Sequence, residues 1–264
     1  MLWNGIKKAI NRAGAQIMVK TGQIEETSDM GYDYEEKRYK TMKNKSKKLQ
    51  REFKLYLESL KMLTRAQKNV LEVLAAFYGD GPHVSSLAIE YRKTMNEIST
   101  NALEEIQQPY FQTVINPNTR FQSYFLEIDK VIKKRLGKLL DYEALMAKVK
   151  KLSENPTEEK IYETKLNEAQ SQLEESQKAY QVVNDQLKNE MPKFVNLRIP
   201  FLDPLFELFI KLQLRFFSQS RKEMERMNGA LDMKTRQDYL SGELDNRIDE
   251  VLGKMKELNI TGFT

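Results

Sequence analysis

Residues 1–20 combine apolar and basic side chains in a pattern that suits contact with a lipid surface. On a helical wheel, their apolar side chains fall within an arc of about 120°. Lys7, Lys8 and Arg12 lie outside that arc, and the segment contains no acidic residue. A short basic helix with an apolar face and a Trp is typical of a segment that lies in a membrane interface. We therefore expect these basic side chains to bind lipid head groups and the following apolar ones to insert into the membrane: Leu2, Trp3, Ile6, Ile10 and Ile17.

Two other interpretations of this segment remain open when it is considered alone. A mitochondrial presequence is also amphipathic, basic and poor in acidic residues, and a core helix at the start of a domain also has an apolar face. A secretory signal is disfavoured, because polar residues interrupt the apolar ones before a core of about seven residues forms. The residues that follow must decide among these interpretations.

The composition narrows the possible function classes. The 264 residues include no Cys, so disulfides, thiol nucleophiles and thiolate metal sites are excluded, as is common in cytosolic proteins. No stretch approaches the roughly 18 apolar residues that cross a bilayer, so we expect any membrane contact to be peripheral. The net charge of +5 suits an anionic partner, either phospholipid or nucleic acid.

The residue types that enzymes use are sparse. His83 is the only His and lies in a Gly-Pro turn, where a surface role is more common than a catalytic one. The chain has no phosphate-binding loop, no dinucleotide fingerprint, no nucleophile elbow and no HExxH or ExxH metal motif. We therefore expect no enzyme activity, no cofactor and no metal.

Three further basic clusters lie beyond the N-terminal segment. The first spans 37–48, where a solvated helix face is an equally good explanation for many of the lysines. The second and third are expected to bind lipid head groups, because each basic side chain near an anionic bilayer contributes about 1 kcal/mol. Nucleic acid is the weaker candidate, since no nucleic-acid-binding motif accompanies the charge. The second cluster is Lys133, Lys134, Arg135 and Lys138, and the third is Lys148, Lys150, Lys151 and Lys160.

Long helices must position these clusters. Apolar residues at a spacing of three to four predict one helix of roughly 45 residues that ends at Tyr78. Ser28 and Asp29 are candidate N-caps for it, and Asp33 with Glu36 is a second possible start. A second helical region is expected over 85–152, with kinks at Pro109 and Pro117. A third follows a turn at 153–156 and carries a strict sevenfold repeat, which indicates helices running side by side. The repeat consists of Leu166, Leu173, Tyr180 and Leu187.

The end of the chain is expected to contain a kink at Pro192, an apolar stretch over 201–217 and a last helix over 234–258. Together these elements predict an all-α, antiparallel three-helix bundle shaped as a thin rod, which buries little core per residue. Apolar surface over 201–217 and 63–77 would then stay partly uncovered. Burial against a second copy is the expected solution, and a monomer folded into a more compact bundle is the alternative.

The sequence resembles a known family, the amphiphysin-type N-BAR domains. The likeness covers essentially the whole chain, and in detail it extends to the short fungal BAR protein of the "reduced viability upon starvation" pair and to the animal bridging integrator without an SH3 domain. Three groups of residues carry it. They are Lys7-x-x-Ile10-Asn11-Arg12-Ala13-Gly14 with Lys20-Thr21-Gly22 and Glu26-Thr27-x-Asp29, then Lys134-Arg135-x-x-Lys138-Leu139-x-Asp141-Tyr142, and Glu190-x-Pro192-x-x-x-Asn196-x-Arg198-Ile199.

The resemblance implies an organisation and a function. Residues 1–25 would form the membrane-inserting segment, 26–258 the BAR domain and 259–264 a short tail. The domain would be a crescent-shaped dimer with basic residues on its concave face and tips, either a homodimer or a heterodimer with an SH3-bearing BAR protein. The family senses or generates membrane curvature in endocytosis, actin-patch organisation and cell division, which implies a cytoplasmic protein at the cell cortex and the division site. The alternative is an interaction scaffold for actin regulators or a Rho-type GTPase pathway, with lipid contact incidental.

Overall fold

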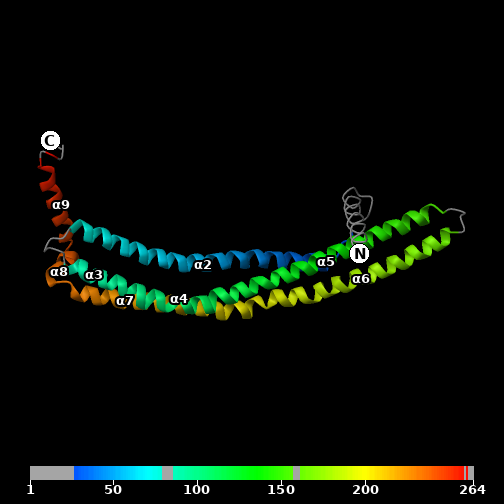
Figure 1. Cartoon of the computed structure of the whole chain (residues 1–264), viewed down its shortest axis with the longest axis horizontal. Coiled ribbons are helices and arrows are strands. Elements are labelled where there is room, and N and C mark those ends of the chain that lie inside the picture. Colours follow the sequence, from blue (N-terminus) through cyan, green and yellow to red (C-terminus); the bar gives the residue numbers. More distant parts are fainter. Residues whose placement is uncertain (1–26, 79–85, 157–160, 259, 261–264) are drawn as a thin grey trace. The chain divides into compact units, whose positions relative to one another are not determined.

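The computed structural model describes residues 27–78, 86–156, 161–258 and 260 (Figure 1). Every regular element in these ranges is helical, and none of them contains a strand. No helix in the same ranges has the length and apolar character needed to cross a membrane. The expected all-α fold is therefore confirmed for the described part of the chain.

The described helices form two compact units, one from the described parts of 1–53 and 114–206 and the other from those of 54–113 and 207–264. The first unit contains the start of α2 (Met30–Tyr78), α5 (Asn116–Glu154), α6 (Tyr162–Asn196) and the start of α7 (Arg198–Ala230). The Oδ1 atom of Asp29 accepts a hydrogen bond of 3.1 Å from the backbone N–H of Tyr32, which caps the N-terminus of α2. The expected first helix is thus confirmed, with Asp29 as its cap.

The sevenfold repeat of α6 faces the core of the first unit. Tyr180, Val183 and Leu187 are buried, and α5 packs along this face. Aromatic rings fill the neighbouring layer, where the ring of Phe121 stacks on that of Phe201 with centroids 4.4 Å apart. The Tyr39 hydroxyl donates to the backbone carbonyl of Phe125 over 2.9 Å, so the buried hydroxyl is satisfied.

The prolines act less uniformly than the sequence suggests. Pro109 lies inside α4 (Glu105–Tyr110), between the π-helical stretches η1 (Ile98–Glu104) and η2 (Phe111–Ile115), where the backbone departs from the regular α-helical hydrogen-bond pattern. Pro117 lies in the first turn of α5, where a missing N–H is tolerated. Helix α6 continues through Pro192 and ends at Asn196. This end is explained by Pro200, which cannot donate to the carbonyl of Asn196 and clashes with it.

The expected single helix over 234–258 is wrong. The structure has two helices there, α8 (Met233–Ser241) and α9 (Glu243–Lys256), which follow α7 in the second unit. Gly242 separates them with a φ of 78°, a left-handed conformation that ends helices and that only Gly adopts without strain. The second unit also contains α3 (Ser86–Glu97) and the two π-helical stretches up to Thr113.

The prediction of uncovered apolar surface is confirmed for the single chain. In the C-terminal half of α2, Val73 and Phe77 are 69% and 86% exposed. In α7, Leu214 and Phe217 are 65% and 52% exposed. Exposed side chains of this size, gathered on two helices, are typical of surfaces that another protein covers.

Candidate membrane-binding surface

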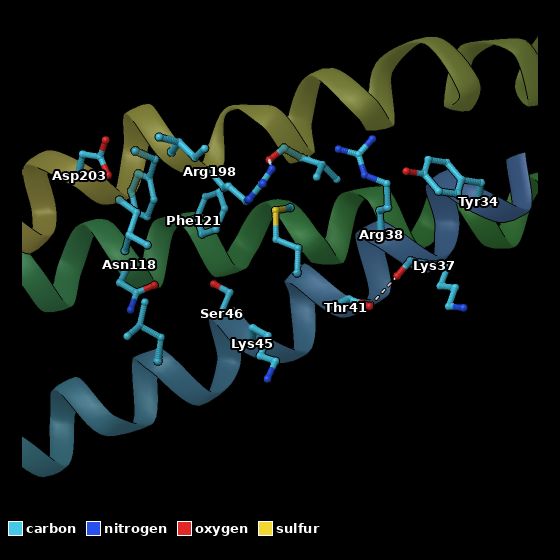
Figure 2. A pocket seen from close by; sticks show the side chains of 16 residues that line it. Tyr34, Lys37, Arg38, Thr41, Lys45, Ser46, Asn118, Phe121, Arg198 and Asp203 are labelled. Atoms are coloured by element: carbon cyan, nitrogen blue, oxygen red, sulfur yellow. Dashed lines mark hydrogen bonds between the residues drawn. The ribbon is translucent and has the colours of Figure 1, made fainter. Parts of the chain in front are cut away.

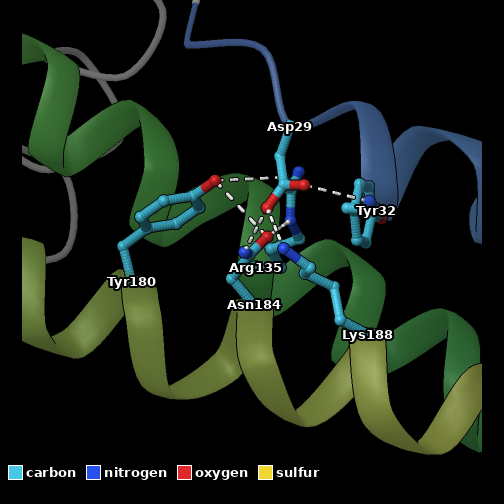
Figure 3. Close-up of polar contacts among 6 residues, drawn as sticks. All are labelled: Asp29, Tyr32, Arg135, Tyr180, Asn184 and Lys188. Atoms are coloured by element: carbon cyan, nitrogen blue, oxygen red, sulfur yellow. Dashed lines mark hydrogen bonds and ion pairs between the residues drawn. The ribbon is translucent and has the colours of Figure 1, made fainter.

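Arg135 lies at the centre of a buried polar cluster in the first unit, not on the surface (Figure 3). Its side chain is only 6% exposed. Its Nε donates to Asn184 Oδ1 over 2.7 Å, and its Nη2 donates to the Tyr180 hydroxyl over 3.0 Å. The guanidinium carbon lies 3.4 Å from the centroid of the Tyr32 ring, a close cation–π contact. The cluster therefore ties α5, α6 and the first turn of α2 together.

The expectation that Arg135 binds lipid head groups is therefore wrong. A guanidinium with this burial and these partners cannot reach a phosphate without unfolding its surroundings. The sequence carried a signal of this, because Arg135 follows Ile128 and Ile132 and precedes Leu139 at helical spacing. It shares the apolar stripe of α5, whereas Lys133 and Lys134 do not.

Asp29 joins the same cluster from the start of α2. Its Oδ2 accepts hydrogen bonds from Asn184 Nδ2 at 2.7 Å and from Lys188 Nζ at 3.0 Å. Burial opposes ionisation of this carboxyl, but these bonds and the one from the Tyr32 N–H outweigh it and lower the pKa of Asp29 to about 2. The adjacent Thr27 N–H donates to Oε1 of the buried Glu143 over 3.1 Å. The chain that leads to residues 1–26 is thus bonded to α5.

Asp29→Asn is expected to lower the free energy of unfolding by about 2 kcal/mol at pH 7, because the native pKa lies below the ordinary 3.8 of an Asp. The stability that the ionised Asp29 contributes is fully present above the pKa of the unfolded state. It is lost as the pH falls through the lower pKa of the folded state. The difference in the free energy of unfolding between wild type and Asp29→Asn should therefore shrink to about 1 kcal/mol at pH 3. Urea unfolding at both pH values measures it, and a difference that stays constant with pH would contradict the assignment.

Four lysines of α5 share one outward face, defined here as the α5 lysine face. At about 100° per residue, they fall within an arc of about 100° that lies away from the apolar stripe. All four are exposed, and none forms an ion pair with a described residue. They are Lys133, Lys134, Lys148 and Lys151.

The other expected head-group ligands divide into two sets. Lys138 is half-buried on the flank of the α5 lysine face. The Nζ atom of Lys150 lies 4.0 Å from Oε1 of Glu154, and Lys150 is rotated by about 100° around the helix axis from Lys151. The remaining ones lie outside the described residues, as do all the expected membrane-inserting side chains. These are Lys7, Lys8, Arg12 and Lys160 among the basic residues, and Leu2, Trp3, Ile6, Ile10 and Ile17 among the apolar ones.

The lysines of α2 are partly engaged within the protein. Lys40 pairs with Glu36 at 2.9 Å, and Lys43 pairs with Asp129 of α5. Lys37 and Lys45 have no ion-pair partner among the described residues and line a groove between helices. The 37–48 cluster is therefore neither a simple solvated face nor one continuous binding surface.

The family of the chain follows from a match to a family model. The BAR domain model matches residues 6–233, which is most of the sequence. This chain belongs to the BAR domain family. The described helices agree, since the amphiphysin BAR domain from Drosophila superposes with a TM-score of 0.64 at 21% identity, over 80% of this chain and 96% of that one. The expected resemblance to amphiphysin-type domains is thus confirmed for the fold.

Two fungal relatives match this BAR protein end to end. "Regulator of cytoskeleton and endocytosis RVS161" from Candida albicans is 38% identical over 100% of this chain and 99% of its own. "Reduced viability upon starvation protein 161" from Saccharomyces cerevisiae is 37% identical over 98% of both chains. The expected likeness to the short fungal BAR proteins is therefore confirmed.

Proposed function

We propose that this BAR protein is a non-enzymatic scaffold that binds anionic membranes at their surface and senses or generates curvature. The observation that carries the proposal is the α5 lysine face on a BAR domain. Its four exposed lysines extend over about 27 Å of one helix, at 1.5 Å per residue. A surface of this kind suits a lipid bilayer better than a single small ligand.

The energetics favour a dimer as the binding form. Each lysine near an anionic surface contributes about 1 kcal/mol, so the α5 lysine face of one copy contributes about 4 kcal/mol. Two copies on one membrane bind with an avidity that neither has alone. The exposed apolar side chains of α2 and α7 supply a surface for such pairing, in a homodimer or in a heterodimer with an SH3-containing BAR protein.

Residues 1–25 complete the proposal as a membrane-inserting segment in front of the BAR domain of 26–258 and the tail of 259–264. Thr27, which follows this segment in the sequence, is bonded to Glu143 of the helix that carries the lysines. Charge would draw the protein to the membrane, and Leu2, Trp3, Ile6, Ile10 and Ile17 would then enter it, with Lys7, Lys8 and Arg12 at the head groups.

The cellular role that we propose links the membrane to actin organisation in endocytosis and cytokinesis, at the cell cortex. The support is the name of the Candida albicans relative, a regulator of cytoskeleton and endocytosis. The match to that relative covers 100% of this chain and 99% of its own, so it is not limited to one part of either chain.

Co-sedimentation with liposomes tests the lipid part of the proposal. Binding to liposomes with 30% phosphatidylserine is expected to fall at least tenfold when the salt concentration rises from 50 to 500 mM, about a threefold change in the Debye length. Liposomes of phosphatidylcholine alone serve as the control. Equal binding to both compositions would overturn the electrostatic mechanism.

Ile6→Glu is expected to abolish tubulation of anionic liposomes while lowering their binding less than about threefold, since insertion follows attraction by charge. Electron microscopy measures tubulation, and co-sedimentation of the same samples measures binding. Asn11→Glu places the same charge on the polar face and is the matched control. If both variants tubulate like wild type, residues 1–25 do not act by insertion.

A further inference from the structure

A groove of about 780 Å³ lies in the first unit between the start of α2 and the junction of α6 with α7 (Figure 2). Apolar side chains form much of its lining, among them Met42, Leu49 and Phe201. Four basic residues also line it, namely Lys37, Arg38, Lys45 and Arg198, against a single acidic one, Asp203. The groove therefore suits an occupant with an apolar face and acidic flanks.

The lining of the groove contains an unsatisfied polar group. Asn118 lines the groove and is only 2% exposed, and its Nδ2 has no hydrogen-bond partner among the described residues. A buried amide without a partner costs about 1–3 kcal/mol, and native proteins rarely leave one unpaired. Because this amide nitrogen is covered by its neighbours, a contact with an occupant would require a small movement of the lining around Asn118.

Helix α9 has the complementary properties and no buried residue of its own. Its apolar side chains Ile248, Val251, Leu252 and Met255 are each about half exposed and fall within an arc of about 100°. Its first eight residues, 243–250, are acidic overall, because Glu243, Asp245, Asp249 and Glu250 outnumber Arg247. An amphipathic helix is stabilised when its apolar face packs against a partner, and the apolar face of α9 is still partly exposed to water.

We propose that the groove holds helix α9 of a second copy of this chain. The lengths agree, since the 14 residues of α9 span about 21 Å and the lining from Tyr34 to Leu49 spans about 22 Å along α2. The charges agree as well, with the acidic residues 243–250 of α9 against the basic lining. Residues 1–26 fit less well, because their lysines and Arg12 would meet like charge. Two copies would exchange two identical contacts, as a two-fold dimer requires.

The absence of Cys from the chain allows a direct test by cross-linking. A copy with Thr41→Cys, at the groove, is mixed with a copy with Val251→Cys, on the apolar face of α9, and oxidised without lipid. We expect a disulfide-linked species of twice the monomer mass. Asn246→Cys, on the opposite face of α9, is the matched control and should cross-link at least tenfold less.

The double variant Thr41→Cys with Val251→Cys in one chain separates the alternatives. A cross-link within single chains, and none between copies, would overturn the proposal in favour of α9 folding onto its own groove. Cross-linking at 246 as strong as at 251 would show a contact without the proposed orientation and would also overturn it.

Exchanging the charges gives a second, independent measurement. Lys37→Glu with Lys45→Glu, and separately Asp245→Lys with Asp249→Lys, should each raise the dimer dissociation constant at least tenfold in sedimentation velocity. Combining all four changes should restore most of the affinity. No rescue, with folding intact by circular dichroism, would contradict the pairing. Because no lipid is present, this result is independent of the proposed membrane function.

Discussion

Reversing the charge of Lys133 and Lys134 to Glu is expected to weaken binding to anionic liposomes by about a thousandfold. Each reversal removes an attraction of about 1 kcal/mol and adds a repulsion of similar size, so the pair changes the binding free energy by about 4 kcal/mol per copy. Both side chains are exposed and form no ion pair with a described residue, so the fold should lose less than about 0.5 kcal/mol.

The matched control changes the same number of charges on another helix. Lys178→Glu with Lys193→Glu alters two exposed lysines of α6, and among the described residues the only ion pair lost is the exposed one between Lys178 and Glu174. We expect this control to weaken binding only severalfold, through net charge. Co-sedimentation over a series of lipid concentrations measures both variants. Equal losses would show that total charge, rather than the α5 lysine face, controls binding.

The helices were predictable because their signals are local and repeated. Leu187 and its sevenfold neighbours lie on one face whatever packs there, so the buried side of α6 follows from spacing alone. Asp29 was one of the caps expected for the first helix, since a short carboxylate before a helical pattern satisfies a free N–H. Such features depend on few residues at short range.

Two features were not predicted, one because it depends on tertiary partners and one because its local signal is weak. Arg135 looked like one of four cations within six residues, and only α6 and the start of α2 reveal that its partners are Asn184, Tyr180 and Tyr32. The break at Gly242 was missed because a single Gly within a helical pattern is often tolerated. A helical wheel centred on Ile132 and Leu139 would have separated Arg135 from its lysine neighbours.

Arg135→Ala is expected to lower the free energy of unfolding by about 3 kcal/mol. The guanidinium donates hydrogen bonds to Asn184 and to the Tyr180 hydroxyl, and each such bond from a charged group contributes about 1.5–3 kcal/mol before the loss is partly relieved by water. The cation–π contact with Tyr32 contributes about a further 1–2 kcal/mol where it is desolvated. Guanidinium chloride unfolding followed by circular dichroism measures the change.

Two further variants separate the charge of Arg135 from its shape. Arg135→Lys keeps the charge but lacks the planar fork that reaches both Asn184 and Tyr180, so it should recover only about a third of the lost stability. Lys134→Ala, one residue away on the surface, should change stability by less than about 0.5 kcal/mol and weaken liposome binding instead. The opposite pattern, a stable Arg135→Ala that fails to bind lipid, would return Arg135 to the membrane surface. The two neighbouring residues thus test whether folding and membrane binding are divided between the two faces of α5.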